Sequence, residues 1–248
     1  MKEVSIGSWV TLNHFSIVEV MAGAGFDWLC VDMEHSVIDY YEAQKLIATI
    51  QAKGLEAYVR VGENNTRIIK RILDAGADGI IVPMVNSAAE ATRAVEAVKY
   101  PPVGKRGVGL ARAQNYGLDN GFPEYRDGKA KEIKLIVQIE HINAINELEE
   151  ILALDGIDGT FIGPYDLSGS MGKPGQYNDE DVRQALARYE AIAKKIDKWM
   201  GFHVIEPDHK EFIRRVDQGY NFLAFSLDTL FLGSICRQEV TAIKEKLK

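Results

Sequence analysis

Cysteine is scarce in this sequence, which has Cys30 and Cys236 in a chain of 248 residues. Two isolated cysteines in so long a chain exclude a disulfide framework and are typical of a reducing compartment. A chain of this length can bury a large core without covalent cross-links. The first five residues also lack the basic start and apolar run of a signal peptide, so we expect a cytoplasmic protein.

The sequence also lacks long apolar runs and a positive net charge. It has no stretch of the roughly 20 apolar residues that a membrane-spanning helix needs. Its 29 Lys and Arg residues against 36 Asp and Glu residues give a formal net charge of −7. Such a chain repels the phosphates of nucleic acids and of membrane surfaces. We therefore expect neither nucleic acid nor membrane among its partners.

Short apolar runs, rich in β-branched and aromatic residues, alternate with segments of helical periodicity. The runs predict strands at residues 6–10, 28–31, 57–61, 79–82, 135–139, 160–162, 200–205 and 222–225. The segments after them predict helices at residues 16–24, 41–53, 66–75, 88–98, 144–153, 180–195, 209–218 and 230–247. Continuous apolar runs are typical of parallel strands that are buried on both faces.

Eight strand–helix units predict a (β/α)8 TIM barrel that forms a single domain over residues 1–248. Such a barrel typically needs about 250 residues, so it would use the whole chain. The alternative is a doubly wound open sheet, but no glycine-rich nucleotide-binding motif follows the first predicted strand. Gly25, Gly76, Gly156 and Gly219 follow predicted helices and should adopt the left-handed conformation that ends a helix. The longest irregular stretch, from Tyr100 to about Lys131, predicts a functional loop.

Two acidic residues follow neighbouring predicted strands at the end of the barrel where catalytic groups lie. Glu140 follows the fifth strand, and Asp166 follows the sixth. Carboxylates this close repel each other unless a cation or a proton lies between them. Oxygen ligands with room for water favour Mg²⁺ or Mn²⁺. The alternative is that either residue only caps the following helix.

His35 and Arg60 end the second and third predicted strands. His35 is either a general base or a structural histidine, and its position at a strand end favours the base. Arg60 is either a clamp for a developing oxyanion or one half of an ion pair between strands. No strand end carries a lysine that could form a Schiff base, which favours metal chemistry. The other four histidines do not form a zinc-ligand spacing with the cysteines; these histidines are His14, His141, His203 and His209.

Seven short motifs occur in order along the chain. They are Ala22-Gly23-Ala24-Gly25-Phe26-Asp27-Trp28, Asp32-Met33-Glu34-His35, Val82-Pro83-Met84-Val85, Tyr100-Pro101-Pro102, Arg106-Gly107-Val108-Gly109, Val137-Gln138-Ile139-Glu140 and Phe161-Ile162-Gly163-Pro164-Tyr165-Asp166-Leu167-Ser168. Together they resemble the metal-dependent class II pyruvate aldolases that act on 4-hydroxy-2-oxoheptanedioate and 2-dehydro-3-deoxyglucarate, over about residues 5–235. The resemblance implies a barrel of the phosphoenolpyruvate/pyruvate type. It also implies reversible cleavage of a 4-hydroxy-2-oxo acid, through a metal-bound enolate, into pyruvate or a close 2-oxo acid and an aldehyde.

The resemblance also implies roles for individual residues. Glu140 and Asp166 match the ligands of a divalent metal ion, which is Mg²⁺ or Mn²⁺, with Co²⁺ as a further candidate. His35 matches the general base, Arg60 matches the residue that stabilises the enolate oxyanion, and Asp74 matches a carboxylate that raises the basicity of the histidine. The expected substrate-binding residues are Gln138, Gly163, Pro164, Tyr165, Trp9 and Val204.

Asp74 ends the third predicted helix and so belongs at the opposite end of its own barrel from His35. It could reach a histidine across a subunit contact, and its alternative role is structural. Tyr165 stands where this family usually has a small residue. The segment from Arg106 to Arg112 looks shorter than in the enzymes that act on 4-hydroxy-2-oxoheptanedioate. We expect both features near the substrate, where they would affect the choice of aldehyde.

The resemblance implies a homo-oligomer, with a hexamer favoured. The apolar residues 230–235 that open the last predicted helix could pack on a neighbouring subunit or on their own barrel. Two functional alternatives stay open: an oxaloacetate decarboxylase that uses the same metal site, and a non-catalytic barrel that binds a 2-oxo acid.

Overall fold

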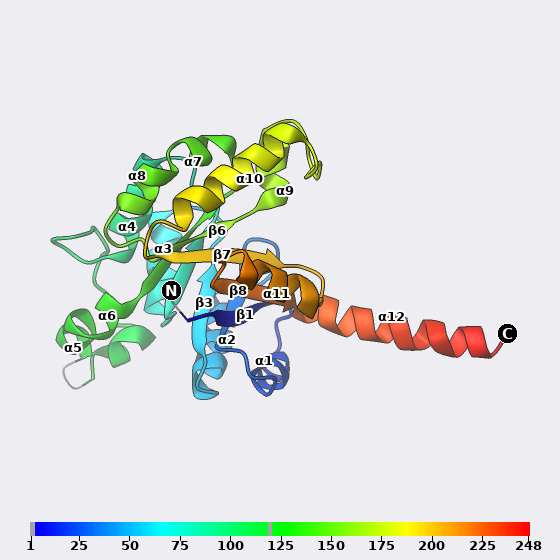
Figure 1. Ribbon diagram of the computed structural model, residues 1–248. Helices are drawn as coiled ribbons and strands as arrows, with labels where there is room; N and C mark the ends of the chain where they lie inside the picture. The colour runs from blue at the N-terminus through cyan, green and yellow to red at the C-terminus, as the bar shows by residue number, and fades with distance from the viewer. Residues whose placement is uncertain (1–2, 119–120) are drawn as a thin grey trace.

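Eight parallel strands close into a barrel, and helices surround it (Figure 1). The computed structural model describes residues 3–118 and 121–248. Each strand pairs with the next one along the chain, and β8 pairs with β1. The strands are β1 (Ser5–Val10), β2 (Trp28–Asp32), β3 (Glu56–Arg60), β4 (Gly79–Val82), β5 (Lys134–Ile139), β6 (Gly159–Ile162), β7 (Trp199–Val204) and β8 (Phe222–Leu227). The predicted (β/α)8 barrel is confirmed.

The main helices agree with the predicted ones to within a few residues. The helices are α1 (Phe15–Ala22), α2 (Tyr40–Ala52), α3 (Thr66–Asp74), α4 (Ala88–Val98), η1 (Arg112–Gly117), α5 (Gly121–Asp127), α6 (Lys129–Glu132), α7 (Ile142–Asn146), α8 (Leu148–Ala153), α9 (Pro164–Ser170), α10 (Glu180–Ala193), α11 (His209–Asp217) and α12 (Asp228–Lys246). Glu147 splits the helix predicted at residues 144–153 into α7 and α8.

Two further differences concern segments for which no helix was predicted. The stretch after Tyr100 contains η1, α5 and α6, so its prediction as a continuous loop is wrong. Asp119 and Asn120 in that stretch lie outside the described residues, as do Met1 and Lys2 at the start of the chain. The chain after β6 forms the short helix α9, because Pro164 has a backbone angle suited to a first helical turn.

Local chemistry fixes the ends of several helices. The side chain of Asp39 accepts a hydrogen bond from the backbone N–H of Glu42, and the side chain of Glu42 accepts one from the backbone N–H of Asp39, so the two form a capping box at the start of α2. Just after the C-terminal end of α3, Gly76 has a φ of 102°, which a residue with a side chain adopts only with strain. The three other predicted turn glycines also have a positive φ.

Aromatic side chains fill the lower part of the barrel interior. The indole of Trp28 stacks on Phe222 with ring centroids 4.5 Å apart, and Tyr58 packs edge-on against both rings. Gly7 makes room for this stack, because a Cβ atom there would overlap the Trp28 ring. The interior below the carboxyl ends of the strands is therefore solid, and polar groups collect above it.

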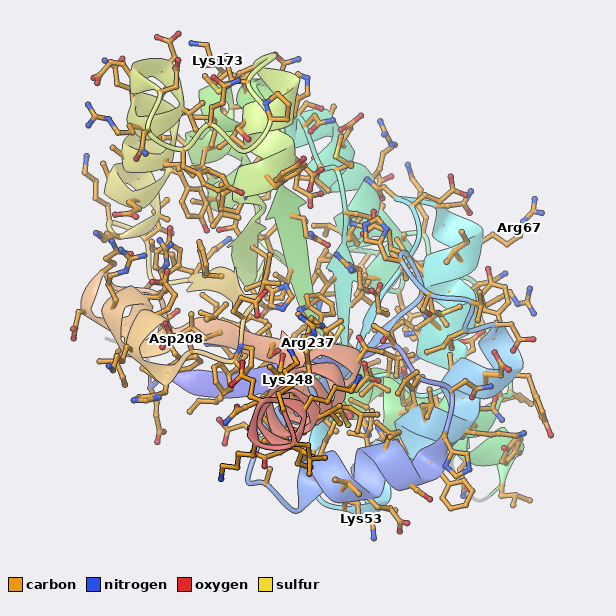
Figure 2. The ribbon with its side chains drawn as sticks, turned by 90° about the vertical axis from the view of Figure 1, so that its right-hand side faces the viewer. Lys53, Arg67, Lys173, Asp208, Arg237 and Lys248 are labelled. Atoms are coloured by element: carbon orange, nitrogen blue, oxygen red, sulfur yellow. The ribbon has the colours of Figure 1, made fainter. Side chains whose placement is uncertain are left out.

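The last helix, α12, leaves the body of the protein. Figure 1 shows it running away from the barrel to the C-terminus, and Figure 2 views it from its outer end. Phe231 near its start packs on Phe225 of β8, but the described residues from 235 onward are exposed. Within the described part of the chain, no helix combines the length and the apolar character needed to cross a membrane.

Candidate active site

A cavity of about 640 Å³ opens at the carboxyl ends of the strands and continues between α10 and α11. It brings together nine of the eleven predicted site residues: Trp9, Arg60, Gln138, Glu140, Gly163, Pro164, Tyr165, Asp166 and Val204. His35 and Asp74 do not line it. Polar groups thus meet where the catalytic groups of such barrels lie.

Glu140 follows β5 and is 6% exposed. Its carboxylate accepts hydrogen bonds from Gln138 Nε2 at 2.8 Å and from the backbone N–H of Met84 at 3.0 Å. Burial raises the pKa of Glu140 to about 7; the Met84 N–H opposes this shift, and the charges of Glu34 and Asp166 add to it. A buried carboxylate with two acidic neighbours is stabilised by a cation.

Asp166 lies in the first turn of α9 and faces the same cavity. Gly163 lets this turn approach β5, because a Cβ atom at Gly163 would lie 2.8 Å from Cγ of Glu140. The carboxylate of Asp166 accepts no hydrogen bond from the residues that the structure describes, so nothing in those contacts supports a role as a helix cap. Its charge acts on Glu140 and Glu34 instead.

Arg60 connects the acidic groups of β2 to the cavity. Its Nε and Nη2 atoms donate to the two carboxylate oxygens of Asp32 at 2.9 and 2.6 Å, and Nη1 lies 3.3 Å from Glu34 Oε2. Its guanidinium also lies over the Trp9 ring, 4.4 Å from the centroid. Burial disfavours the charged guanidinium, but Asp32 outweighs this and raises the pKa of Arg60. The ion pair predicted for Arg60 is present, and the cation still lines the cavity.

Burial raises the pKa of Glu34, and Arg60 opposes this effect. Glu34 lies between Arg60, which lines the cavity, and His35, and its carboxylate is close to both. The His35 ring lies outside the cavity lining, with its side chain 71% exposed and Nε2 3.8 Å from Glu34 Oε2.

Asp74 is not close to His35 within the chain. It ends α3, at the end of the barrel opposite His35, and accepts hydrogen bonds from Arg106 Nη2 at 2.9 Å and from Gln114 Nε2 at 3.2 Å. Arg106 is itself buried. The expectation that the segment from Arg106 to Arg112 lies near the substrate is wrong for the chain's own site, because this segment packs beside Asp74 and none of it lines the cavity.

Tyr165 forms an outer wall of the cavity. The residue is 59% exposed, and its ring lies against Gly175, where an added Cβ would be 3.4 Å from the ring. Tyr177 lines the same wall. The ring therefore leans away from Asp166 toward the loop that joins α9 to α10.

The structure adds polar residues that the sequence reasoning left out of the predicted site. Asp32 and Glu34 were visible as polar residues at a strand end, but nothing in the sequence indicated that both would bind Arg60. His203 lines the cavity from β7; it was visible as a polar residue at a predicted strand end, but no role in the site was predicted for it. Its inward direction could have been found from the period of two along β7, which puts Trp199, Gly201 and His203 on one face of the strand.

Comparison with known proteins agrees with this arrangement. The family model "HpcH/HpaI aldolase/citrate lyase" matches residues 5–232. The chain belongs to this family. It is therefore an aldolase, a carbon–carbon lyase, and the non-catalytic alternative is set aside.

Relatives in the HpcH/HpaI family cover most of the chain. A hydroxypyruvate/pyruvate aldolase of Sagittula stellata is 37% identical over 228 residues, which is 92% of this chain and 88% of that protein. A 2-keto-3-deoxy-L-rhamnonate aldolase of Klebsiella pneumoniae is 36% identical over 231 residues, or 92% of this chain and 84% of that protein. The crystal structure of a family member from Burkholderia cenocepacia has a TM-score of 0.90 at 32% identity and covers 98% of this chain and 95% of that one.

Proposed function

We propose that this aldolase is metal-dependent and reversibly cleaves 4-hydroxy-2-oxo acids into pyruvate, or a close 2-oxo acid, and an aldehyde. The observation that carries the proposal is the buried carboxylate of Glu140, which shares one cavity with Asp166 and Arg60. The names of the relatives support the substrate class, because they include a 2-keto-3-deoxy acid aldolase and a hydroxypyruvate/pyruvate aldolase.

Glu140 and Asp166 are the residues that would hold a divalent ion. The donor set fits, since both are carboxylates and Glu140 gains from a cation that offsets its burial and its acidic neighbours. Oxygen ligands that leave several positions for water and substrate suit Mg²⁺ or Mn²⁺. When bound, such an ion supplies Lewis-acid polarisation of the keto group of the substrate.

Arg60, Gln138 and the turn at Gly163 would hold the 2-oxo acid. The partly buried Arg60 offers positive charge where negative charge develops on the keto oxygen, and its ion pair with Asp32 fixes its orientation. The buried Oε1 of Gln138 has no hydrogen-bond partner among the described residues, so it can accept a hydrogen bond from a bound substrate.

His35 would act as the general base. In the cleavage direction it accepts the proton of the C4 hydroxyl, directly or through one water, as the C4–O bond becomes a carbonyl. The C3–C4 bond breaks, and its electron pair passes to the 2-oxo acid half as an enolate. Carbon 3 then takes a proton from solvent, which completes pyruvate. The exposed position of His35 suits contact with the aldehyde half.

We also infer that the chain forms a homo-oligomer, with a hexamer favoured by the family resemblance. The exposed helix α12 supports this, since it carries an apolar stripe at helical spacing: Leu232, Ile235, Val240, Ile243 and Leu247. We assign the stripe to contact with a second copy of the chain. A further subunit could also bring an Asp74 side chain toward a His35 ring, and this is the proposed route for the role of Asp74 in catalysis.

Pyruvate release, measured with lactate dehydrogenase, tests the proposal. The assay uses a panel of 4-hydroxy-2-oxo acids and oxaloacetate, each with and without EDTA. We expect release from at least one hydroxy-oxo acid, loss of release with EDTA, and recovery with excess Mg²⁺ or Mn²⁺. Release from oxaloacetate alone would favour the decarboxylase alternative, and release that EDTA leaves unchanged would contradict the metal assignment.

A further inference from the structure

His203 is a partly buried histidine in the cavity to which the proposed reaction gives no role. It lies on β7, one residue from the end of the strand, and lines the cavity together with Arg60 and Gln138. Its ring packs edge-on against Trp9, with centroids 5.7 Å apart. These contacts put an ionisable ring directly beside the expected 2-oxo acid.

One ring nitrogen of His203 is committed to the backbone. Nε2 lies 3.1 Å from the carbonyl oxygen of Ser226, which can only accept, so Nε2 carries the proton. The Ser8 hydroxyl donates to the same carbonyl at 3.2 Å, which helps to fix that carbonyl. Burial lowers the pKa of His203 to about 4, and the Arg60 charge also lowers it, so the ring is neutral near pH 7.

The second nitrogen, Nδ1, is then a lone-pair acceptor. No described residue donates a hydrogen bond to it. Close by, the N–H of the Trp9 indole is buried and has no hydrogen-bond partner among the described residues. Trp9 and His203, which both line the cavity, thus leave one donor and one acceptor without partners among the described residues. A hydroxyl group can satisfy both at once, because it donates one hydrogen bond and accepts others.

The depth of His203 indicates which half of the substrate carries this hydroxyl. Arg60, Gln138 and His203 are the inward side chains nearest the carboxyl ends of their strands, just above the aromatic layer of the interior. Tyr165 and Tyr177, in contrast, are partly exposed at the outer wall. His203 therefore lies at the level of the 2-oxo acid and below the level of the aldehyde.

We propose that His203, together with Trp9, binds a hydroxyl group on carbon 3 of the 2-oxo acid and so selects 3-hydroxy-2-oxo acids over their unsubstituted counterparts. This inference rests on the proposed function, because it assigns a substrate contact within the same site. The preferred nucleophilic substrate is then hydroxypyruvate or a close analogue.

The test compares hydroxypyruvate with 2-oxobutanoate, which has a methyl group where hydroxypyruvate has its hydroxyl. Exchange of the C3 protons for deuterium in Mg²⁺-containing D₂O, followed by ¹H NMR, reports enolisation of each acid without any aldehyde. His203→Leu removes the acceptor, whereas His203→Asn keeps an amide oxygen near the position of Nδ1. Circular dichroism and thermal unfolding check that both variants fold, and Trp9→Phe removes the donor separately.

For His203→Leu we expect kcat/KM to fall by about 10-fold or more with hydroxypyruvate and by less than about 3-fold with 2-oxobutanoate. His203→Asn should keep most of the wild-type preference, and Trp9→Phe should weaken it. An unchanged ratio in His203→Leu and Trp9→Phe would overturn the assignment, as would equal losses with both acids. If the wild-type protein exchanges neither acid, the proposed function fails, and the assignment fails with it.

Discussion

At the residue scale, the acidic pair Glu140 and Asp166 carries the proposed metal site. Both side chains face a cavity at the carboxyl ends of the strands, so neither is needed to complete the core. We expect Glu140→Ala and Asp166→Ala to lose bound divalent metal and aldolase activity while the fold stays intact. Metal analysis of the purified proteins, together with circular dichroism, measures this. Full metal occupancy in the Asp166→Ala protein would remove Asp166 from the ligands.

The pKa of Glu140 gives a second prediction at this scale. Its value in the folded protein, about 7, lies above the ordinary value of 4.5. The stabilising contribution of the protonated carboxyl is therefore complete below about pH 4.5 and is lost as the pH rises through about 7. In EDTA, from about pH 5 to about pH 8, the free energy of unfolding of the wild type should fall relative to Glu140→Gln by on the order of 2–3 kcal/mol.

Urea unfolding of both proteins at each pH measures this difference. Added Mg²⁺ should restore the stability of the wild type at the higher pH and leave Glu140→Gln nearly unaffected, because a bound cation offsets the charge of the carboxylate. Parallel pH profiles for the two proteins in EDTA would contradict the environment assigned to Glu140.

At the scale of elements, the loop between α9 and α10 forms the outer wall of the cavity. Tyr165 leans on Gly175 in this loop, away from Asp166. Tyr165→Ala should therefore change the preference between small and large aldehydes by about 1–3 kcal/mol, the usual scale for reshaping an apolar pocket. It should have a smaller effect on oxaloacetate decarboxylation, which uses no aldehyde. Kinetics with paired aldehydes test this; a lower melting temperature with unchanged aldehyde preference would mark the ring as structural.

The sequence was sufficient to predict the strands and main helices of the barrel, because each depends on local hydrophobic periodicity. It was not sufficient for the short helices after Tyr100, where four to seven residues give too little periodicity to distinguish a helix from a turn. The break at Glu147 was missed for a related reason, since the apolar spacing continues across α7 and α8.

For the site, strand ends could be read from the sequence, but the partners of each side chain could not. Glu140, Asp166 and Arg60 follow apolar runs, so their presence at one rim follows from closure of the barrel. The bidentate contact of Arg60 with Asp32 depends on the register of β2 against β3, which only the structure fixes. The same is true of His203, whose Ser226 contact joins β7 to β8.

At the scale of the whole molecule, α12 is the feature that a single copy of the chain leaves unexplained. Its apolar stripe should bury against a second copy, so Ile243→Asp should shift the protein toward smaller species. Thr241→Asp is the matched control, because Thr241 lies on the opposite side of the same helix and is also exposed. Light scattering with size-exclusion chromatography measures both. A wild-type mass near 27.6 kDa at micromolar concentration would contradict the assembly.

The central claim, that Glu140 and Asp166 support metal-dependent enolisation of a 2-oxo acid, has one direct test. Exchange of the methyl protons of pyruvate for deuterium, followed by ¹H NMR, requires neither the physiological aldehyde nor a coupling enzyme. We predict exchange above the enzyme-free rate with Mg²⁺, none with EDTA, and none in Asp166→Ala. Exchange that continues at the same rate in EDTA, or its absence in folded wild-type protein loaded with Mg²⁺, would contradict the claim.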